Sequence, residues 1–316
     1  MRHWMRRALA ALVAGMLGLA SAAALAQAAP ACPPLLPSAA KADTAGAARD
    51  RGLLWRLTRD GRTSYLYGTL HIGKPAWRRF GPQLQAALRA SDVLALEVDP
   101  NDPDLLAALA ELRHGAELPP ALAARLKRAY ERACMAPESL AELHPVLQAT
   151  TLTVLEARWL GMDPSFAMEQ LLGTEARAQG RRVVALETAV QQMAALVPDN
   201  DAEAQAAIEH SLQQLEDRSA RRVLARLAAA WETGDLAALD DYAAWCECIA
   251  DDSDRAFMRR LNDERNPLLA DGVEALHRQG RRVFAAVGAL HMTGPQSLPR
   301  LLAERGFRVD RVPFGR

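Results

Sequence analysis

Two histidines of the chain follow glycines at the ends of apolar runs, in segments that resemble each other. Gly68 is followed by Thr-Leu-His71, and Gly288 is followed by Ala-Leu-His291. The runs before the glycines are typical of buried strands, and glycine leaves room above a sheet for an imidazole to enter a cleft. Two imidazoles that converge on one cleft are elements of a metal site or of general acid–base hydrolysis.

Two glutamates end further apolar runs, Glu97 in the run 93–98 and Glu187 in the run 182–187. Functional groups of α/β proteins gather past the carboxyl ends of strands, so we expect both carboxylates in the cleft of the histidines. The alternative for Glu97 is a solvated carboxylate at a strand end. The alternative for Glu187 is a helix start, because Thr188 is a suitable N-cap residue.

A polar run, Asp263-Glu-Arg-Asn-Pro267, contains Arg265 and Asn266 between two predicted helices. An ordinary interhelical turn explains such a run from its composition alone. The functional interpretation is that Arg265 enters the cleft as an anion clamp or stabilises a transition state. The sequence has no glycine-rich phosphate loop, no His-Glu-x-x-His and no Gly-x-Ser-x-Gly, which removes the simplest nucleotide-binding, zinc-protease and serine-hydrolase assignments.

The elements that must position these residues alternate between strands and helices. Apolar runs predict the strands, and stretches rich in Ala, Leu, Arg and Glu with helical spacing predict the helices. Asp60-Gly61 between the first two runs predicts a hairpin. The predicted strands cover 53–58, 64–70, 93–98, 182–187, 282–287 and 307–312, and the longer predicted helices cover 121–133, 139–160, 164–179, 202–233 and 267–279.

The two Gly-x-x-His segments also lie in matching contexts. Each precedes a Gly-Pro-Gln, an amphipathic helix and a short strand. We therefore predict an α/β (α+β) fold with a central mixed sheet built from two related β-GxxH-α-β halves, and a large helical insert at about 100–270. His71 and His291 lie 220 residues apart, so both ends of the chain must build one cleft. This predicts a single domain over 51–316.

The first 26 residues predict a secretory signal peptide. Three arginines precede an uncharged apolar stretch at 8–20, and Ala24-Leu-Ala26 is a typical cleavage site. Residues 27–50, rich in Ala and Pro, predict a flexible leader. The chain has 38 Lys and Arg against 38 Asp and Glu, so a cut after Ala26 would leave a net charge of about −3. We expect a periplasmic or secreted protein that does not bind nucleic acid and has no stable membrane span in the mature chain.

Four cysteines follow the predicted cleavage site: Cys32, Cys134, Cys246 and Cys248. An even number in an oxidising compartment favours disulfides. Cys246 and Cys248 are expected to be too close for an easy mutual bridge, so bridges to Cys32 or Cys134 are at least as plausible. A metal or redox role for the Cys-x-Cys is the alternative, although no second Cys pair completes a four-ligand zinc site.

Six motifs, in this order and at this spacing, resemble the TraB/GumN family over about residues 50–314. They are Tyr67-Gly-Thr-Leu-His-Ile-Gly73, Leu96-Glu-Val-Asp99, Gly161-Met-Asp163, Leu186-Glu-Thr188, Glu264-Arg-Asn266 and Val287-Gly-Ala-Leu-His-Met-Thr-Gly294. The resemblance implies a relationship to the Tiki-type metalloproteases, and a remoter one to erythromycin-esterase-like and ChaN-like folds. In the Tiki group the paired Gly-x-x-His motifs and an intervening Glu are associated with metal-dependent peptide cleavage, which implies the same role here for His71, Glu97 and His291.

The leading hypothesis is therefore an exported, metalloprotease-like hydrolase that acts on a peptide or another small substrate. A divalent ion (Mn, Co or Zn) would be held by the two histidines and Glu97, with Glu187 orienting a ligand or activating the bound water. Arg265 and Asn266 would hold the substrate or the developing oxyanion. Two alternatives remain open: a metal-independent, esterase-like hydrolase in which Glu97 orients a histidine base, and a non-catalytic periplasmic protein that binds a peptide or haem.

Overall fold

The computed structural model describes residues 32–37, 48–111 and 118–314. Its strands are β1 (Leu53–Arg59), β2 (Arg62–Thr69), β3 (Val93–Leu96), β4 (Arg182–Ala185), β5 (Val283–Gly288) and β6 (Arg308–Val312). Its α-helices are α2 (Pro82–Arg89), α3 (Pro103–Glu111), α4 (Pro120–Arg132), α5 (Pro145–Leu155), α6 (Met168–Ala178), α7 (Ala189–Leu196), α8 (Asp201–Glu216), α9 (Ser219–Thr233), α10 (Leu236–Asp240), α11 (Tyr242–Trp245), α12 (Asp252–Leu261), α13 (Asn266–Arg278) and α14 (Leu298–Glu304). Short 3-10 segments are η1 (Pro75–Arg78), η2 (Pro137–Ser139), η3 (Glu156–Leu160), η4 (Pro164–Phe166) and η5 (Ala289–Met292).

The strands β1 and β2 form the predicted antiparallel hairpin. Asp60 and Gly61 at its tip both have positive φ, 50° and 70°. This conformation matches the twist of strands that are joined by a two-residue turn. The turn fixes the register in which Leu53 pairs with Gly68, and so places Gly68 near the carboxyl end of β2.

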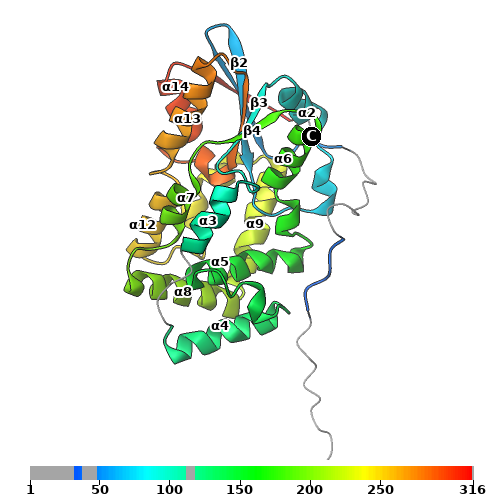
Figure 1. Ribbon diagram of the computed structural model, residues 1–316. Coiled ribbons are helices and arrows are strands. Elements are labelled where there is room, and N and C mark those ends of the chain that lie inside the picture. Colours follow the sequence, from blue (N-terminus) through cyan, green and yellow to red (C-terminus); the bar gives the residue numbers. More distant parts are fainter. Residues whose placement is uncertain (1–31, 38–47, 112–117, 315–316) are drawn as a thin grey trace, which may run out of the picture. The chain divides into compact units, whose positions relative to one another are not determined.

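All six strands belong to one mixed sheet in the order β4-β3-β5-β2-β1-β6, which confirms the predicted α/β class (Figure 1). β4, β3, β5 and β2 run parallel, and β1 lies antiparallel between β2 and β6. The central strand β5 is fully buried from Val283 to Val287. Because parallel strands end at the same edge, the segments that follow β2, β3, β4 and β5 meet there.

The two predicted β-GxxH-α-β halves are present. β2 leads through α2 to β3, which lies beyond β5, whereas β5 leads through α14 to β6 at the other end of the sheet. Crossovers between parallel strands are right-handed. Because the first crossover moves along the sheet toward β4 and the second moves toward β6, their helices lie on opposite faces of the sheet. Figure 1 shows α2 and α6 on one face of the sheet and α13 and α14 on the other.

Among the described residues between β3 and α13, the regular elements are helices except for β4. Figure 1 shows α3, α5, α7, α8 and α9 beyond the edge where the parallel strands end. Part of this layer has its own core, in which Leu126 of α4, Leu152 of α5 and Ile208 of α8 are buried together. No helix in the described part of the chain is long and apolar enough to cross a membrane.

Two long predicted helices are interrupted. The predicted helix at 202–233 is α8 and α9, because Arg218 has a left-handed backbone with φ 63° and Asp217 accepts a hydrogen bond from a backbone N–H at the start of α9. The regular α-helical part of the predicted helix at 139–160 is Pro145–Leu155, and Glu156–Leu160 is a 3-10 segment. A residue that precedes proline avoids helical backbone angles, which explains this start.

Cys246 and Cys248 are joined to each other by a disulfide, and no cysteine of the described residues is free. Their Cα atoms lie 5.0 Å apart, which is within the usual span of a disulfide. The expectation that the two residues are too close for an easy bridge was therefore wrong. The backbone turns after α11, and this turn brings the two Cα atoms to a distance that a disulfide spans.

Candidate active site

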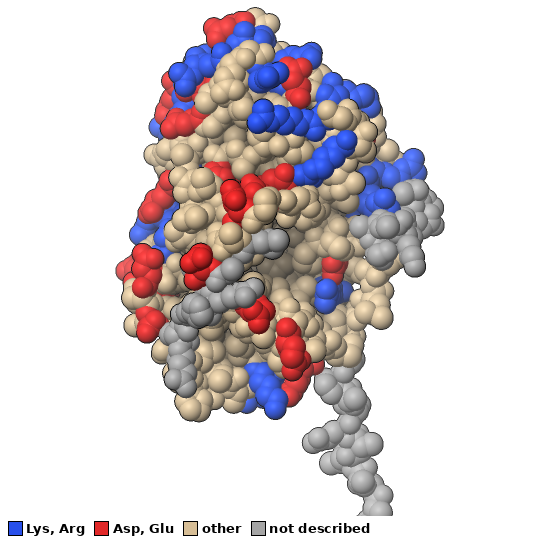
Figure 2. Space-filling model, in the orientation of Figure 1, with Lys and Arg blue, Asp and Glu red and all other residues tan. Residues whose placement is uncertain are grey.

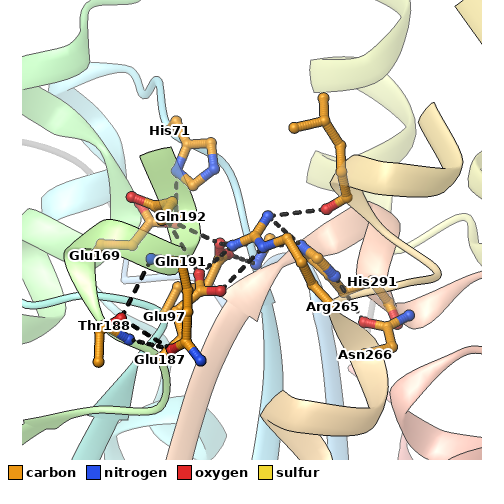
Figure 3. Close-up of polar contacts among 12 residues, drawn as sticks. His71, Glu97, Glu169, Glu187, Thr188, Gln191, Gln192, Arg265, Asn266 and His291 are labelled. Atoms are coloured by element: carbon orange, nitrogen blue, oxygen red, sulfur yellow. Dashed lines mark hydrogen bonds and ion pairs between the residues drawn. The ribbon is translucent and has the colours of Figure 1, made fainter. Parts of the chain in front are cut away.

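The edge where the parallel strands end brings together both histidines and Glu97 (Figure 3), and all three lie close to Gly288. A Cβ atom placed on Gly288 would lie 3.3 Å from Glu97 Oε1, 3.4 Å from His291 Cδ2 and 3.7 Å from His71 Nε2. Glu97 Oε1 and His71 Nε2 are therefore at most about 7 Å apart. A side chain at position 288 would enter the space that these three groups share, which explains the glycine of the second motif.

The segment after β2 is tied to the start of α6, and this contact explains two further motif residues. Gly73 and Asp163 exchange backbone hydrogen bonds of 3.1 and 2.9 Å, and Met168 N donates to Leu70 O at 3.0 Å. A Cβ atom on Gly73 would collide with the carbonyl of Phe166. The contact holds α6 beside His71.

Glu169, in the first turn of α6, is the residue that this contact brings to His71. Its Oε1 lies 3.1 Å from His71 Nδ1 and accepts the hydroxyl of Thr69. Glu169 is 8 % exposed, and its Oε2 has no hydrogen-bond partner among the described residues. Figure 3 shows the His71 ring beside this carboxylate. The pair fixes Nδ1 as the nitrogen facing the carboxylate, and leaves Nε2 on the side of Glu97.

A second group of charges lies deeper, where Arg265 joins Glu97 to Glu187. Arg265 Nη2 donates to Glu97 Oε2 at 2.5 Å and also to Glu187 Oε1, and Arg265 Nε donates to Glu187 Oε2 at 3.1 Å. Glu97 Oε1 accepts Gly288 N at 2.7 Å. The side chains of the two glutamates are 5 % and 0 % exposed, and that of Arg265 is 12 % exposed. The group is therefore a buried ion-pair network.

The remaining nitrogen of Arg265, Nη1, contacts Leu261 O at 2.9 Å and His291 Nε2 at 3.4 Å. Protein acceptors thus face all five N–H groups of the guanidinium. The geometry favours a role for Arg265 in orienting Glu97 and His291 and in balancing their charge. An anion clamp on a substrate would require one of these contacts to open.

Asn266 fixes the tautomer of His291. The Asn266 amide nitrogen donates to Gln296 O at 2.8 Å, so its Oδ1 is the atom that faces His291 Nδ1 at 2.7 Å. An amide oxygen only accepts, so Nδ1 carries the proton and Nε2 presents its lone pair toward Arg265 and Glu97. Asn266 itself is fully buried. It orients a site residue from behind rather than facing the cleft.

The two imidazoles differ in their environments. Burial lowers the pKa of His291 to about 4, so this ring is neutral at neutral pH. The Glu169 carboxylate raises the pKa of His71. Because 66 % of the His71 side chain is exposed, water screens part of this attraction. His71 is thus the more basic and the more accessible histidine.

The two glutamates of the ion-pair network also differ. Burial would raise the pKa of Glu97, but His291, His71 and Arg265 together with a backbone N–H lower it to about 2. Burial raises the pKa of Glu187 above its usual value despite the contact with Arg265. One cation between two carboxylates leaves the network anionic when both are ionised.

The predicted metal ligands do not form a ready metal site. No group of three or more His, Cys, Asp or Glu within residues 48–111 and 118–314 is arranged to hold a metal ion. His291 Nε2 lies 3.9 Å from Glu97 Oε2, but the Arg265 guanidinium contacts both groups. The residues as they lie therefore do not fit a shared ion, because a positive charge of the chain already occupies this position. The divalent ion stays a prediction from the resemblance.

The model of the TraB/PrgY/gumN family matches residues 53–311, which include every residue of the site. The chain belongs to the TraB/PrgY/gumN family. The resemblance of the six ordered motifs is thus confirmed. No curated protein and no solved structure matches the chain. Membership of the family fixes no reaction, so the activity must be argued from the side chains.

Within this TraB/PrgY/gumN domain, the structure unites His71, Glu97, Glu187, Arg265 and His291, and places Asn266 behind them. The sequence interpretation missed Glu169 and Gln192. Gln192 Nε2 lies 3.4 Å from both Glu97 Oε2 and Glu187 Oε1. Both missed residues lie in the first turn of a helix, where polar side chains are common, so sequence patterning offered no signal for them.

A pocket of about 290 Å³ adjoins the network where Glu187 forms part of its wall. It lies between the start of α3 and the start of α7 and is lined by Val98, Asp102, Asp104, Leu105, Ala185, Leu186, Glu187, Thr188, Ala189 and Gln191. Figure 2 shows a hollow on this face of the domain with Asp and Glu side chains beside it. The pocket therefore combines apolar walls with acidic groups.

Proposed function

We propose that this chain is a hydrolase of amide or ester bonds in which His71 activates water. The observation that carries the proposal is the His71–Glu169 pair, in which a buried carboxylate holds Nδ1 while Nε2 faces the Glu97 and His291 side of the cleft. An imidazole held in this way by a carboxylate is the usual form of a general base. The orienting carboxylate is thus Glu169, where the metal-independent hypothesis had assigned Glu97.

In the proposed reaction, His71 Nε2 takes a proton from water, and the water oxygen adds to the substrate carbonyl. Glu169 stabilises the imidazolium that forms. The bond from the carbonyl carbon to the leaving nitrogen or oxygen then breaks, and the imidazolium returns the proton to that leaving atom. Arg265, Glu97 and His291 form a rigid wall whose hydrogen bonds are already satisfied before substrate binds. Such preorganisation lowers the cost of positioning the reacting groups.

The adjoining pocket supports a peptide as the substrate. Asp102 and Asp104 in its wall favour a positively charged group, such as an amino terminus or a basic side chain. Val98 and Leu105 offer apolar contact for a neighbouring side chain. Peptides combine both features with a hydrolysable amide bond, and we propose an exported peptide as the substrate class.

The test measures hydrolysis of a peptide library and of nitrophenyl esters by the purified chain and by two histidine variants. We expect H71A to lose about 10²- to 10⁴-fold in kcat/KM, the usual contribution of a general base. H210A is the matched control, because His210 also pairs with a carboxylate, Asp254, at 2.7 Å. Equal activity of both variants and the wild type would refute the proposal.

A chelator separates this reaction from the metal-dependent one that the resemblance implies. Metal-independent catalysis predicts that activity survives dialysis against a strong chelator. Loss of activity on dialysis and recovery on addition of Mn²⁺, Co²⁺ or Zn²⁺ would instead establish a metal enzyme. Binding of a peptide or of haem without any product would support the non-catalytic alternative.

A further inference from the structure

The Cys246–Cys248 disulfide lies outside the candidate active site, in the turn between α11 and α12. A bridge across one residue closes a very short loop, so it restricts the unfolded chain far less than a long-range disulfide does. Other contacts already hold this turn: Trp245 Nε1 donates to Ala238 O at 2.7 Å, and Ile249 N donates to Cys246 O at 3.2 Å. The bridge therefore adds little stability to a turn that these hydrogen bonds already hold.

The two sulfur atoms have different surroundings. Cys246 is 5 % exposed, whereas Cys248 is half-buried and lies closer to solvent. The backbone N–H of Cys248 donates to Cys246 Sγ at 3.2 Å. The Tyr242 hydroxyl lies 3.2 Å from Cys248 Sγ, and because a disulfide sulfur carries no proton, the hydroxyl is the donor. Burial raises the pKa of Tyr242 to about 12, which keeps this donor protonated.

We propose that Cys246–Cys248 is a thiol–disulfide exchange site that oxidises thiols of other exported proteins or peptides. A thiolate attacks Cys248 Sγ, the more accessible sulfur, and forms a mixed disulfide. The bond between the two cysteines breaks, and its electron pair goes to Cys246 Sγ, whose negative charge the backbone N–H stabilises.

A second thiolate of the partner then attacks the partner's own sulfur in the mixed disulfide. The products are an oxidised partner disulfide and Cys248 as a thiolate. The two protons released by the partner thiols end on Cys246 and Cys248. The partner is thus oxidised by two electrons, and the chain is reduced to a dithiol. A partner with two neighbouring thiols supplies the attacking thiolate for both steps.

The first experiment equilibrates the native full chain with glutathione buffers of increasing reducing power, then alkylates free thiols and maps them by mass spectrometry. The proposal predicts that Cys246 and Cys248 become alkylated together without denaturant, while the far-UV circular dichroism stays unchanged. A bridge that opens only in denaturant would overturn the proposal. Mapping by peptide separates these two cysteines from Cys32 and Cys134.

The second experiment tests the order of attack with single variants. C246S leaves the accessible Cys248 thiol and should trap a mixed disulfide with glutathione disulfide at least about tenfold faster than C248S, which leaves the buried thiol. The wild type should also oxidise a peptide dithiol at least about tenfold faster than the C246S/C248S double variant. Equal trapping by both single variants, or equal oxidation by the double variant, would refute the assignment.

Discussion

Replacement of Arg265 by alanine would leave two carboxylates buried without their shared partner. The side chains of Glu97 and Glu187 are 5 % and 0 % exposed, so bulk solvent screens their charges poorly. Removal of one member of a buried ion pair costs about 3–5 kcal/mol. We therefore expect the free energy of unfolding of R265A to fall by about this amount, which corresponds to a fall in Tm of roughly 6–20 °C for a domain of this size.

The effect of R265A should depend on pH with a defined sign. In the wild type the pKa of Glu97 is held at about 2, so its stabilising contribution is complete above the unfolded value and is lost only as pH falls toward 2. In R265A Glu187 loses Arg265, the cation that lowers its pKa, and burial should raise this pKa further above the unfolded value, whereas Glu97 keeps His71 and His291 beside it. The folded variant then gains stability as pH falls through the raised pKa. The difference between variant and wild type should be largest near neutral pH and smaller in mild acid.

Denaturant unfolding followed by circular dichroism, near neutral pH and again in mild acid, measures both effects. R300A is the matched control, because Arg300 and Glu304 form an ion pair that is 61 % and 56 % exposed. Removal of an exposed pair changes stability by at most about 1 kcal/mol. A loss of less than about 1 kcal/mol in R265A, or an equal loss at both pH values, would refute the assignment of a buried network.

Three further substitutions test the geometry around the histidines. G288V should abolish hydrolysis while leaving the fold intact by circular dichroism, because the added side chain enters the space beside His71; activity equal to that of the wild type would contradict this. Activity should rise with pH through the raised pKa of His71, and E169Q should move that rise to lower pH and reduce the plateau; an unmoved pH–rate profile would separate Glu169 from catalysis. N266A should cost about 1–3 kcal/mol of stability and lower activity by releasing the His291 tautomer, as nitrogen-detected NMR of the ring would reveal.

The fold and much of the site could be predicted from the sequence because they depend on local rules. The Asp60-Gly61 turn and the apolar runs predicted the strands, and the glycines before His71 and His291 predicted where a cleft could open. The helix boundaries were harder to predict, because the left-handed backbone between α8 and α9 lies at Arg218 and not at a glycine. Glu169 could not be found in this way, because a backbone contact between distant segments brings it to the site.

Most residues of the site could be identified from the sequence, but the role of each residue could not. A role depends on which charged groups surround the residue in the folded chain. Glu97 directly follows β3 and Glu187 lies two residues after β4, so the ends of two neighbouring parallel strands bring two carboxylates together in a buried place. Such a pair requires a positive charge, whether from a bound cation or from the chain. Arg265, in a segment that resembles an ordinary turn, supplies that charge from the junction of α12 and α13. The helical segment between the two halves thus completes the electrostatics of a cleft whose other polar groups come mainly from the sheet.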